Sequence, residues 1–183
     1  CTSGPAFALT GQTRGPFTIE TNRNRMTKAA APAKSDKKTP KAHPYADRTR
    51  YKFWNTDKLR LTDVDHQHHV NNAIFAVLYT SVRADFLGSY VRPLVAKSDM
   101  FAMVKITIEY LAEMHYPGQV EVGIVIKRLG SSSITFSQAM YKDGVCCSVA
   151  EAVMVLLDPL TRRAKPFPAG IAAQLTRFID TGE

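Results

Sequence analysis

The sequence is poor in cysteine, in metal-ligand motifs and in long apolar runs. Its 183 residues include three cysteines, Cys1, Cys146 and Cys147. An odd number of cysteines, two of them adjacent, does not predict a disulfide framework and is typical of a reducing compartment. No Cys-x-x-Cys or His-Glu-x-x-His motif occurs, so no metal site is predicted. No run of about 18 apolar residues occurs either, so we expect no membrane span and a cytoplasmic location.

Most of the chain carries almost no net charge, because the excess of positive charge is concentrated in the first 50 residues. The formal net charge is +8, and residues 1–50 hold ten Lys or Arg against three Asp or Glu. Residues 51–183 hold fourteen Lys or Arg against thirteen Asp or Glu. We therefore expect residues 1–48 to be a basic, disordered extension and residues 49–183 to be one folded domain. The nearly neutral domain has no basic stripe, so no nucleic-acid partner is expected.

One long amphipathic helix is predicted near the middle of the chain. From Val70 onward, apolar residues recur at spacings of three and four, which indicates a helix of about 20 residues. Asn71 or Asn72 is suited to cap its start, because a short amide side chain accepts from exposed helix N–H groups. Gly88 and then Pro93 are expected to mark its end.

The rest of the domain has the patterns of strands and tight turns. Asp143-Gly144 predicts a hairpin, and residues 170–179 suggest a short terminal helix. Cys146 and Cys147, on one strand, would point to opposite faces. Five segments are expected to be strands: residues 51–61, 101–110, 120–127, 134–141 and 145–157.

The order of these segments predicts an α+β fold. Short connections favour antiparallel neighbours, so the strands should form one five-stranded antiparallel sheet. A single apolar helix against such a sheet buries both surfaces. Open sheet edges invite pairing with another chain, so a homodimer or a dimer of dimers is expected.

The turn before the helix is the most polar stretch of the domain. Residues 63–72 contain two carboxylates, three imidazoles and three side-chain amides. A turn with so many polar side chains is not suited to form part of a hydrophobic core. A carboxylate facing the positive end of a helix, by contrast, suits attack on a carbonyl group. The turn is therefore the candidate site.

These segments together resemble a known family. Residues 61–86 (LTDVDHQHHVNNAIFAVLYTSVRADF) are similar to the signature of acyl-CoA thioesterases of the 4-hydroxybenzoyl-CoA thioesterase type, which have the hot-dog fold. They also resemble the Asp-x-Asn-x-His-Val-Asn-Asn segment of plant acyl–acyl carrier protein thioesterases. Residues 108–118 and 128–133 resemble later turns of the family. The resemblance covers about residues 50–170.

The resemblance implies roles for individual residues. Its catalytic carboxylate falls on Asp65 and its histidine on His69, whereas Gln67 replaces the asparagine of the plant pattern. Asp65 would activate a water or attack the thioester directly, and the N–H of Asn72 would hold the oxyanion. The substrate would be an acyl-CoA, with no separate cofactor. The residues expected to bind it are Gln67, Asn71, Asn72, Glu113, Arg128, Ser131 and Ser132.

Each assignment has a plainer alternative. Asp63 is suited to stabilise the turn, Asn71 and Asn72 to cap the helix, and Glu113 to be a surface charge. The segment from Lys127 to Ser133 is equally an ordinary solvated turn, and His66 and His68 are expected to face solvent. Two other functions stay open: a non-catalytic acyl-CoA sensor, because a fold does not fix a function, and a thioesterase for acyl carrier protein drawn by the basic extension.

Overall fold

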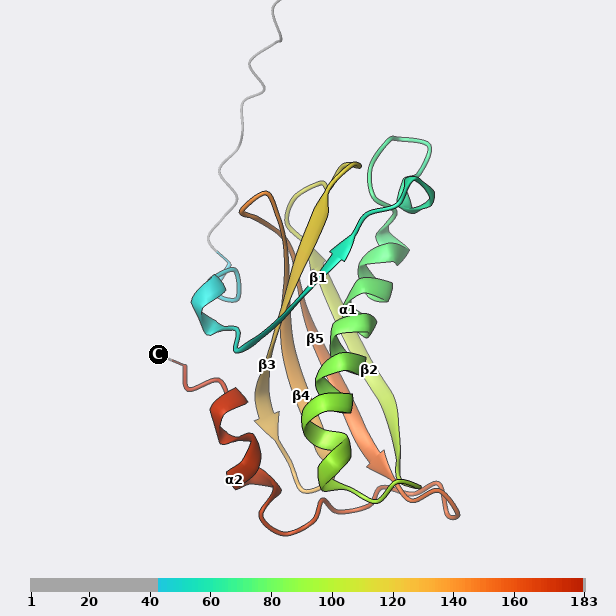
Figure 1. Ribbon diagram of the computed structural model, residues 1–183, viewed down its shortest axis with the longest axis vertical. Coiled ribbons are helices and arrows are strands. Elements are labelled where there is room, and N and C mark those ends of the chain that lie inside the picture. The colour runs from blue at the N-terminus through green and yellow to red at the C-terminus, as the bar shows by residue number, and fades with distance from the viewer. Residues whose placement is uncertain (1–42, 183) are drawn as a thin grey trace, which may run out of the picture. The chain divides into compact units, whose positions relative to one another are not determined.

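The computed structural model describes residues 43–182, so most of the predicted basic extension lies outside the described part. The strands are β1 (Phe53–Lys58), β2 (Met100–Tyr110), β3 (Gln119–Leu129), β4 (Ser133–Lys142) and β5 (Val145–Leu157). They form one antiparallel sheet in the order β1-β3-β4-β5-β2. The helix α1 (Asn72–Phe86) lies along one face of this sheet (Figure 1). The predicted α+β hot-dog architecture is confirmed.

Helix α1 is held to the sheet by the apolar face that its spacing predicts. Its buried apolar residues are Phe75, Leu78, Tyr79, Val82 and Phe86. They share one core with residues of β3, β4 and β5. Burying a side chain of this size contributes roughly 1.5–3 kcal/mol, which makes this face the main attachment of the helix.

The start of α1 agrees with the prediction, whereas its end differs. Asn71 is the N-cap, its Oδ1 accepts from the Ala73 N–H at 2.9 Å, and the helix begins at Asn72. Gly88, which was expected to help mark the end, does not interrupt the helical path. The chain continues through helical turns at Leu87–Val91 and Arg92–Leu94. Proline is tolerated in the first turn of the latter because the N–H it lacks would have had no partner there.

The two faces of the sheet are covered by different parts of the chain. Cys147 belongs to the core beneath α1, whereas Cys146 packs in a smaller cluster on the opposite face, as predicted. Tyr141 on that outer face donates its hydroxyl to the Ala46 carbonyl at 2.9 Å. Residues 43–48, which the sequence assigns to the extension, therefore lie against the sheet.

The chain after β5 returns across one end of the sheet. It contains α2 (Ile171–Leu175) and a following 3-10 turn, in the region expected to be helical. Lys165 Nζ lies 2.7 Å from Oδ1 of the buried Asp99, which ties this segment to the start of β2. None of the described helices is both long and apolar enough to cross a membrane.

Candidate functional site

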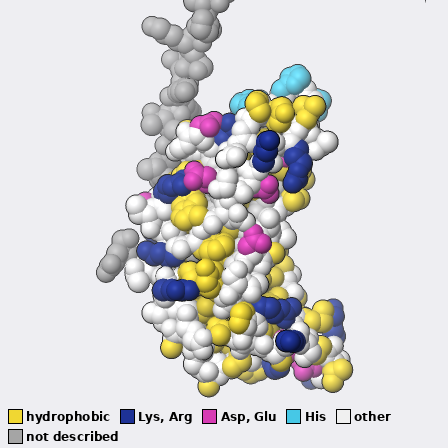
Figure 2. Space-filling model, in the orientation of Figure 1, with side chains coloured by type: hydrophobic (Ala, Val, Ile, Leu, Met, Phe, Trp, Pro, Cys, Tyr) yellow, Lys and Arg dark blue, Asp and Glu magenta, His cyan; other side chains and the backbone are white. Residues whose placement is uncertain are grey.

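A cavity of about 310 Å³ opens where the polar turn, the start of α1 and the end of β2 meet. It lies at the end of the molecule where the histidine side chains gather beside exposed hydrophobic ones (Figure 2). The residues that line it are Asp65, Gln67, His69, Val70, Asn72, Phe75, Tyr110, Leu111, Ala112, Glu113 and Met114.

Backbone contacts fix the shape of the turn. Asp63 is buried, and its Oδ2 accepts from the Arg60 N–H at 2.7 Å while its carbonyl accepts from the Asn71 N–H at 2.8 Å. The Val70 N–H donates to the Met114 carbonyl at 2.8 Å, which joins the turn to the segment after β2. Asp63 therefore stabilises the turn, and its buried carboxylate does not line the cavity.

Asp65 presents its carboxylate at the cavity in ionised form. Its Oδ1 accepts from the Gln67 N–H at 2.8 Å and from the His69 N–H at 3.4 Å. These hydrogen bonds, that from Gln67 foremost, hold the pKa of Asp65 below its ordinary value, and the nearby His66 and His69 act in the same direction. Among residues 43–182, no hydrogen bond occupies Oδ2. That oxygen remains available to a water or a substrate.

His69 belongs to a cluster formed with the segment after β2. Its Nε2 lies 3.4 Å from Oε2 of Glu113, and the same oxygen lies 3.8 Å from Nε2 of His115. The two imidazole rings meet edge to face, with centroids 4.8 Å apart. The structure thus brings Glu113, a predicted substrate-binding residue, to His69. His115 does not line the cavity and was missed, although it lies only two residues after Glu113.

The start of α1 forms one wall of the cavity. The first N–H groups of a helix have no intrahelical acceptor, and Asn72 is the first residue of α1. Its carbonyl accepts from the Tyr110 hydroxyl at 3.2 Å, and the Tyr110 ring packs edge to face on Phe75 with centroids 5.1 Å apart. Because the Ala73 and Ile74 N–H groups donate to Asn71, the Asn72 N–H is the donor that the described start of the helix offers beside this aromatic surface. The sequence did not reveal Tyr110, whose ring reaches the site from β2.

Four of the predicted substrate-binding residues do not line this cavity. Asn71 caps the helix. Arg128, Ser131 and Ser132 lie at the turn between β3 and β4, at the opposite end of the sheet from the polar turn (Figure 1). The Ser131 carbonyl accepts from the Phe167 N–H of the segment after β5, and the Ser132 carbonyl accepts from the Leu156 N–H of β5 itself. Within one chain, this turn cannot contact the same small group as Asp65.

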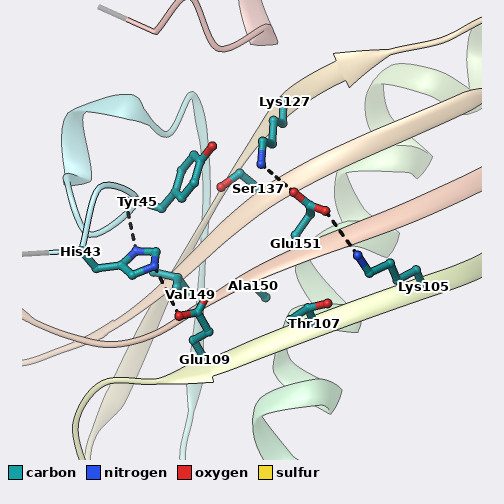
Figure 3. Close-up of a pocket in the computed structure, with 10 residues that line it drawn as sticks. All are labelled: His43, Tyr45, Lys105, Thr107, Glu109, Lys127, Ser137, Val149, Ala150 and Glu151. Carbon is teal, nitrogen blue, oxygen red and sulfur yellow. Dashed lines mark hydrogen bonds and ion pairs between the residues drawn. The ribbon is translucent and has the colours of Figure 1, made fainter.

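A second cavity, of about 210 Å³, lies on the outer face of the sheet (Figure 3). Glu151 extends between Lys127, at 2.6 Å, and Lys105, at 3.9 Å. Glu109 on β2 pairs with His43 at 3.5 Å. Within the described part of the chain, each carboxylate of this cavity is thus paired with a lysine or a histidine.

Comparison with known proteins identifies the family of the chain. A profile of the Thioesterase-like superfamily matches residues 59–175. Acyl-CoA thioester hydrolase YbgC of Escherichia coli is 25% identical over 116 residues, which span 61% of this chain and 87% of YbgC. A predicted thioesterase from Bacillus stearothermophilus superposes with a TM-score of 0.64, 24% identity and coverage of 69% and 96%. Staphylococcus aureus SAV2348, solved in complex with CoA, superposes with a TM-score of 0.62 and 18% identity. The match covers 70% of this chain and 84% of SAV2348.

Proposed function

Because the chain belongs to the Thioesterase-like superfamily, we propose that it is an enzyme that hydrolyses acyl-CoA to a free acid and CoA. One observation carries the proposal above the others: Asp65 holds an ionised carboxylate at a cavity that also receives the first turn of α1. The combination supplies a base or nucleophile on one side of a carbonyl group and the Asn72 N–H donor on the other.

The reaction begins with the thioester carbonyl oxygen directed at the start of α1. The Asn72 N–H stabilises the negative charge that develops on this oxygen, since helix N-termini favour anions. Asp65 Oδ2 removes a proton from a water that attacks the carbonyl carbon, or attacks that carbon itself to form an anhydride that water then hydrolyses. The carbon–sulfur bond breaks in either route, and CoA leaves as a thiolate that takes up a proton.

His69 positions the water or the carbonyl group. Its imidazole is held at Nε2 by Glu113 and its backbone N–H contacts the Asp65 carboxylate. A thiolate is a good leaving group, so the reaction needs no strong general acid. Phe75 and Tyr110 offer the acyl group an apolar surface next to the reacting atoms.

CoA as the carrier of the acyl group is supported by the relatives. YbgC is an acyl-CoA thioester hydrolase and the Staphylococcus aureus protein was solved with CoA. Arg128, Ser131 and Ser132 lie at the other end of the sheet from the cavity of their own chain. We therefore assign their predicted role in substrate binding to the site of a second copy of the chain.

We further propose that the chain forms a homodimer, or a dimer of dimers, through β2. This strand has a neighbour, β5, on one side only. Its side chains Met103 and Val104 are exposed, as is Val77 on α1. An open edge with apolar residues is suited to pairing with another strand. Val104→Glu should shift the protein toward monomer in sedimentation analysis, whereas Val145→Glu, at another exposed valine, on the β4–β5 hairpin, should not. A monomeric wild-type protein would contradict this assignment.

The function is tested with Asp65→Asn, which keeps the size and the hydrogen-bond acceptor of the side chain but removes its charge. Short, medium, long and aromatic acyl-CoAs are supplied, and release of free thiol is measured. We expect wild-type turnover on at least one class and a loss of at least about 100-fold in kcat for the variant. Asp57→Asn, on β1 away from the cavity, is the matched control. Unimpaired hydrolysis by Asp65→Asn would overturn the proposal, and tight wild-type binding without thiol release would favour a sensor.

A further inference from the structure

We propose that His69, Glu113 and His115 form a zinc site at the mouth of the cavity. Each residue offers one ligand atom, and the three atoms lie within 4.8 Å of one another. Two imidazoles and a carboxylate are a ligand set that suits zinc, and three protein ligands leave a fourth position for water. The sequence motifs did not predict this site, because its ligands come from two separate segments.

The distances are close to those that zinc requires. Zinc binds histidine nitrogen and carboxylate oxygen at about 2.0–2.2 Å, so neighbouring ligand atoms in a tetrahedral site lie about 3.3 Å apart. Glu113 Oε2 is 3.4 Å from His69 Nε2 and 3.8 Å from His115 Nε2. The ligand atoms of the remaining pair, His69 and His115, lie within 4.8 Å of one another, and a movement of the exposed His115 side chain is needed to bring them to the spacing of a zinc site.

A backbone contact prepares His115 to bind a metal. Its Nδ1 lies 3.2 Å from the His68 carbonyl oxygen, which can only accept a hydrogen bond. The proton of the neutral ring must therefore be on Nδ1, which leaves the lone pair on Nε2, the atom that faces Glu113. Metal-binding histidines are typically oriented by such a contact of the other nitrogen. His68 has a φ of 65°, uncommon outside glycine, in the turn that presents this carbonyl.

The two ligand-bearing segments are fixed to one another before any metal binds. The Val70 N–H donates to the Met114 carbonyl at 2.8 Å, and each of these residues is adjacent to a proposed ligand. Both are buried in the main core. The ligand backbones are thus held in place, and metal binding has to order only three side chains.

Zinc at this position would take up the Nε2 lone pair of His69. If His69 positions a water or the thioester, zinc should inhibit hydrolysis reversibly; this consequence rests on the proposed function, whereas the binding itself does not. The site would then couple turnover to the concentration of free zinc.

Binding is tested on the full chain with two probes. Cobalt reports tetrahedral nitrogen and oxygen ligation through its visible absorption, and calorimetry measures zinc affinity. His115→Gln should weaken binding at least about tenfold. The matched control is His66→Gln, at an exposed histidine of the polar turn that does not belong to the cluster. This variant should bind zinc as the wild type does. Absence of binding by the wild type, or equal affinity in His115→Gln, would overturn the site.

Measurements of acyl-CoA hydrolysis test the zinc site separately. Without metal, His115→Gln should turn over acyl-CoA as the wild type does. Added zinc should inhibit the wild type and His66→Gln but not His115→Gln, and a chelator should restore the rate. Zinc binding without inhibition would keep the metal site and count against the role given to His69.

Discussion

Glu113 Oε2 lies 3.4 Å from Nε2 of His69 and joins the chain after β2 to the turn before α1. The Glu113 side chain is 67% exposed, so this pair adds little to the stability of the fold. Its effect is instead to fix the direction of an imidazole at the mouth of the cavity. The contact matters for positioning far more than for folding.

The first prediction concerns this positioning. Glu113→Gln removes the charge that holds His69 and should lower kcat roughly 10–100-fold, in the range seen when orienting partners are lost. KM and the free energy of unfolding should change little. Glu109→Gln is a matched control, because Glu109 also pairs with a histidine, His43, on the outer face of the sheet. Equal kinetic effects of the two variants would contradict a positioning role.

The second prediction concerns pH. The pKa of Asp65 is lower in the folded protein than its ordinary value, chiefly because the Gln67 N–H donates to the carboxylate. A lowered folded-state pKa means that the carboxylate stabilises the protein above its unfolded-state pKa of about 3.9, and that this contribution is lost as pH falls through the folded-state pKa. The melting temperature of the wild type should exceed that of Asp65→Asn by a constant amount above about pH 5, and by less at lower pH. A gap that widens on acidification would contradict this.

Local patterns predicted most of the fold. The apolar spacing of α1 was visible because each turn of a helix repeats it, and the Asn71 cap depends on residues two positions away. Asp143 and Gly144 both have positive φ, as the hairpin prediction requires. Gly88 misled the prediction because it keeps a helical conformation there, with open space around it.

What the sequence did not reveal depends on contacts between distant segments. His115 acquires its surroundings only when the segment after β2 meets the polar turn. The polar Arg83 gives no sign in the sequence of being buried, yet its side chain is 1% exposed. Arg128 was predicted to join the site on resemblance alone, and the topology places it at the other end of the sheet.

The third prediction concerns Arg83. Its guanidinium donates to Gln138 Oε1 at 2.5 Å and to Thr80 Oγ1 at 2.8 Å beneath α1. Burial lowers its pKa to about 10, so the group stays charged at neutral pH. Arg83→Ala leaves a cavity and a buried amide without its donor, and should cost about 2–4 kcal/mol in urea unfolding. The exposed Arg128→Ala should cost under about 0.5 kcal/mol.

A double variant separates the hydrogen bond from the packing. Gln138→Leu alone removes the acceptor of one guanidinium nitrogen of the buried Arg83, whereas Arg83→Leu with Gln138→Leu replaces both members of the hydrogen bond by apolar side chains. The double variant should therefore be less destabilised than the sum of the two single variants. Additive losses would show that the two side chains do not interact.

The last prediction concerns the thiols, since a cysteine nucleophile is the main chemical alternative to Asp65. Burial raises the pKa of Cys147 to about 11 and also raises that of Cys146. At pH 8 only about 0.1% of the Cys147 side chains are thiolate, against about a quarter for an ordinary cysteine. Native protein treated with iodoacetamide should therefore label very slowly at both positions, as read by peptide mass spectrometry, and keep its thioesterase activity. Unfolding in urea should expose both to rapid labelling. Fast native alkylation with parallel loss of turnover would instead point to a thiol, and Asp65 would lose its place as the reacting group.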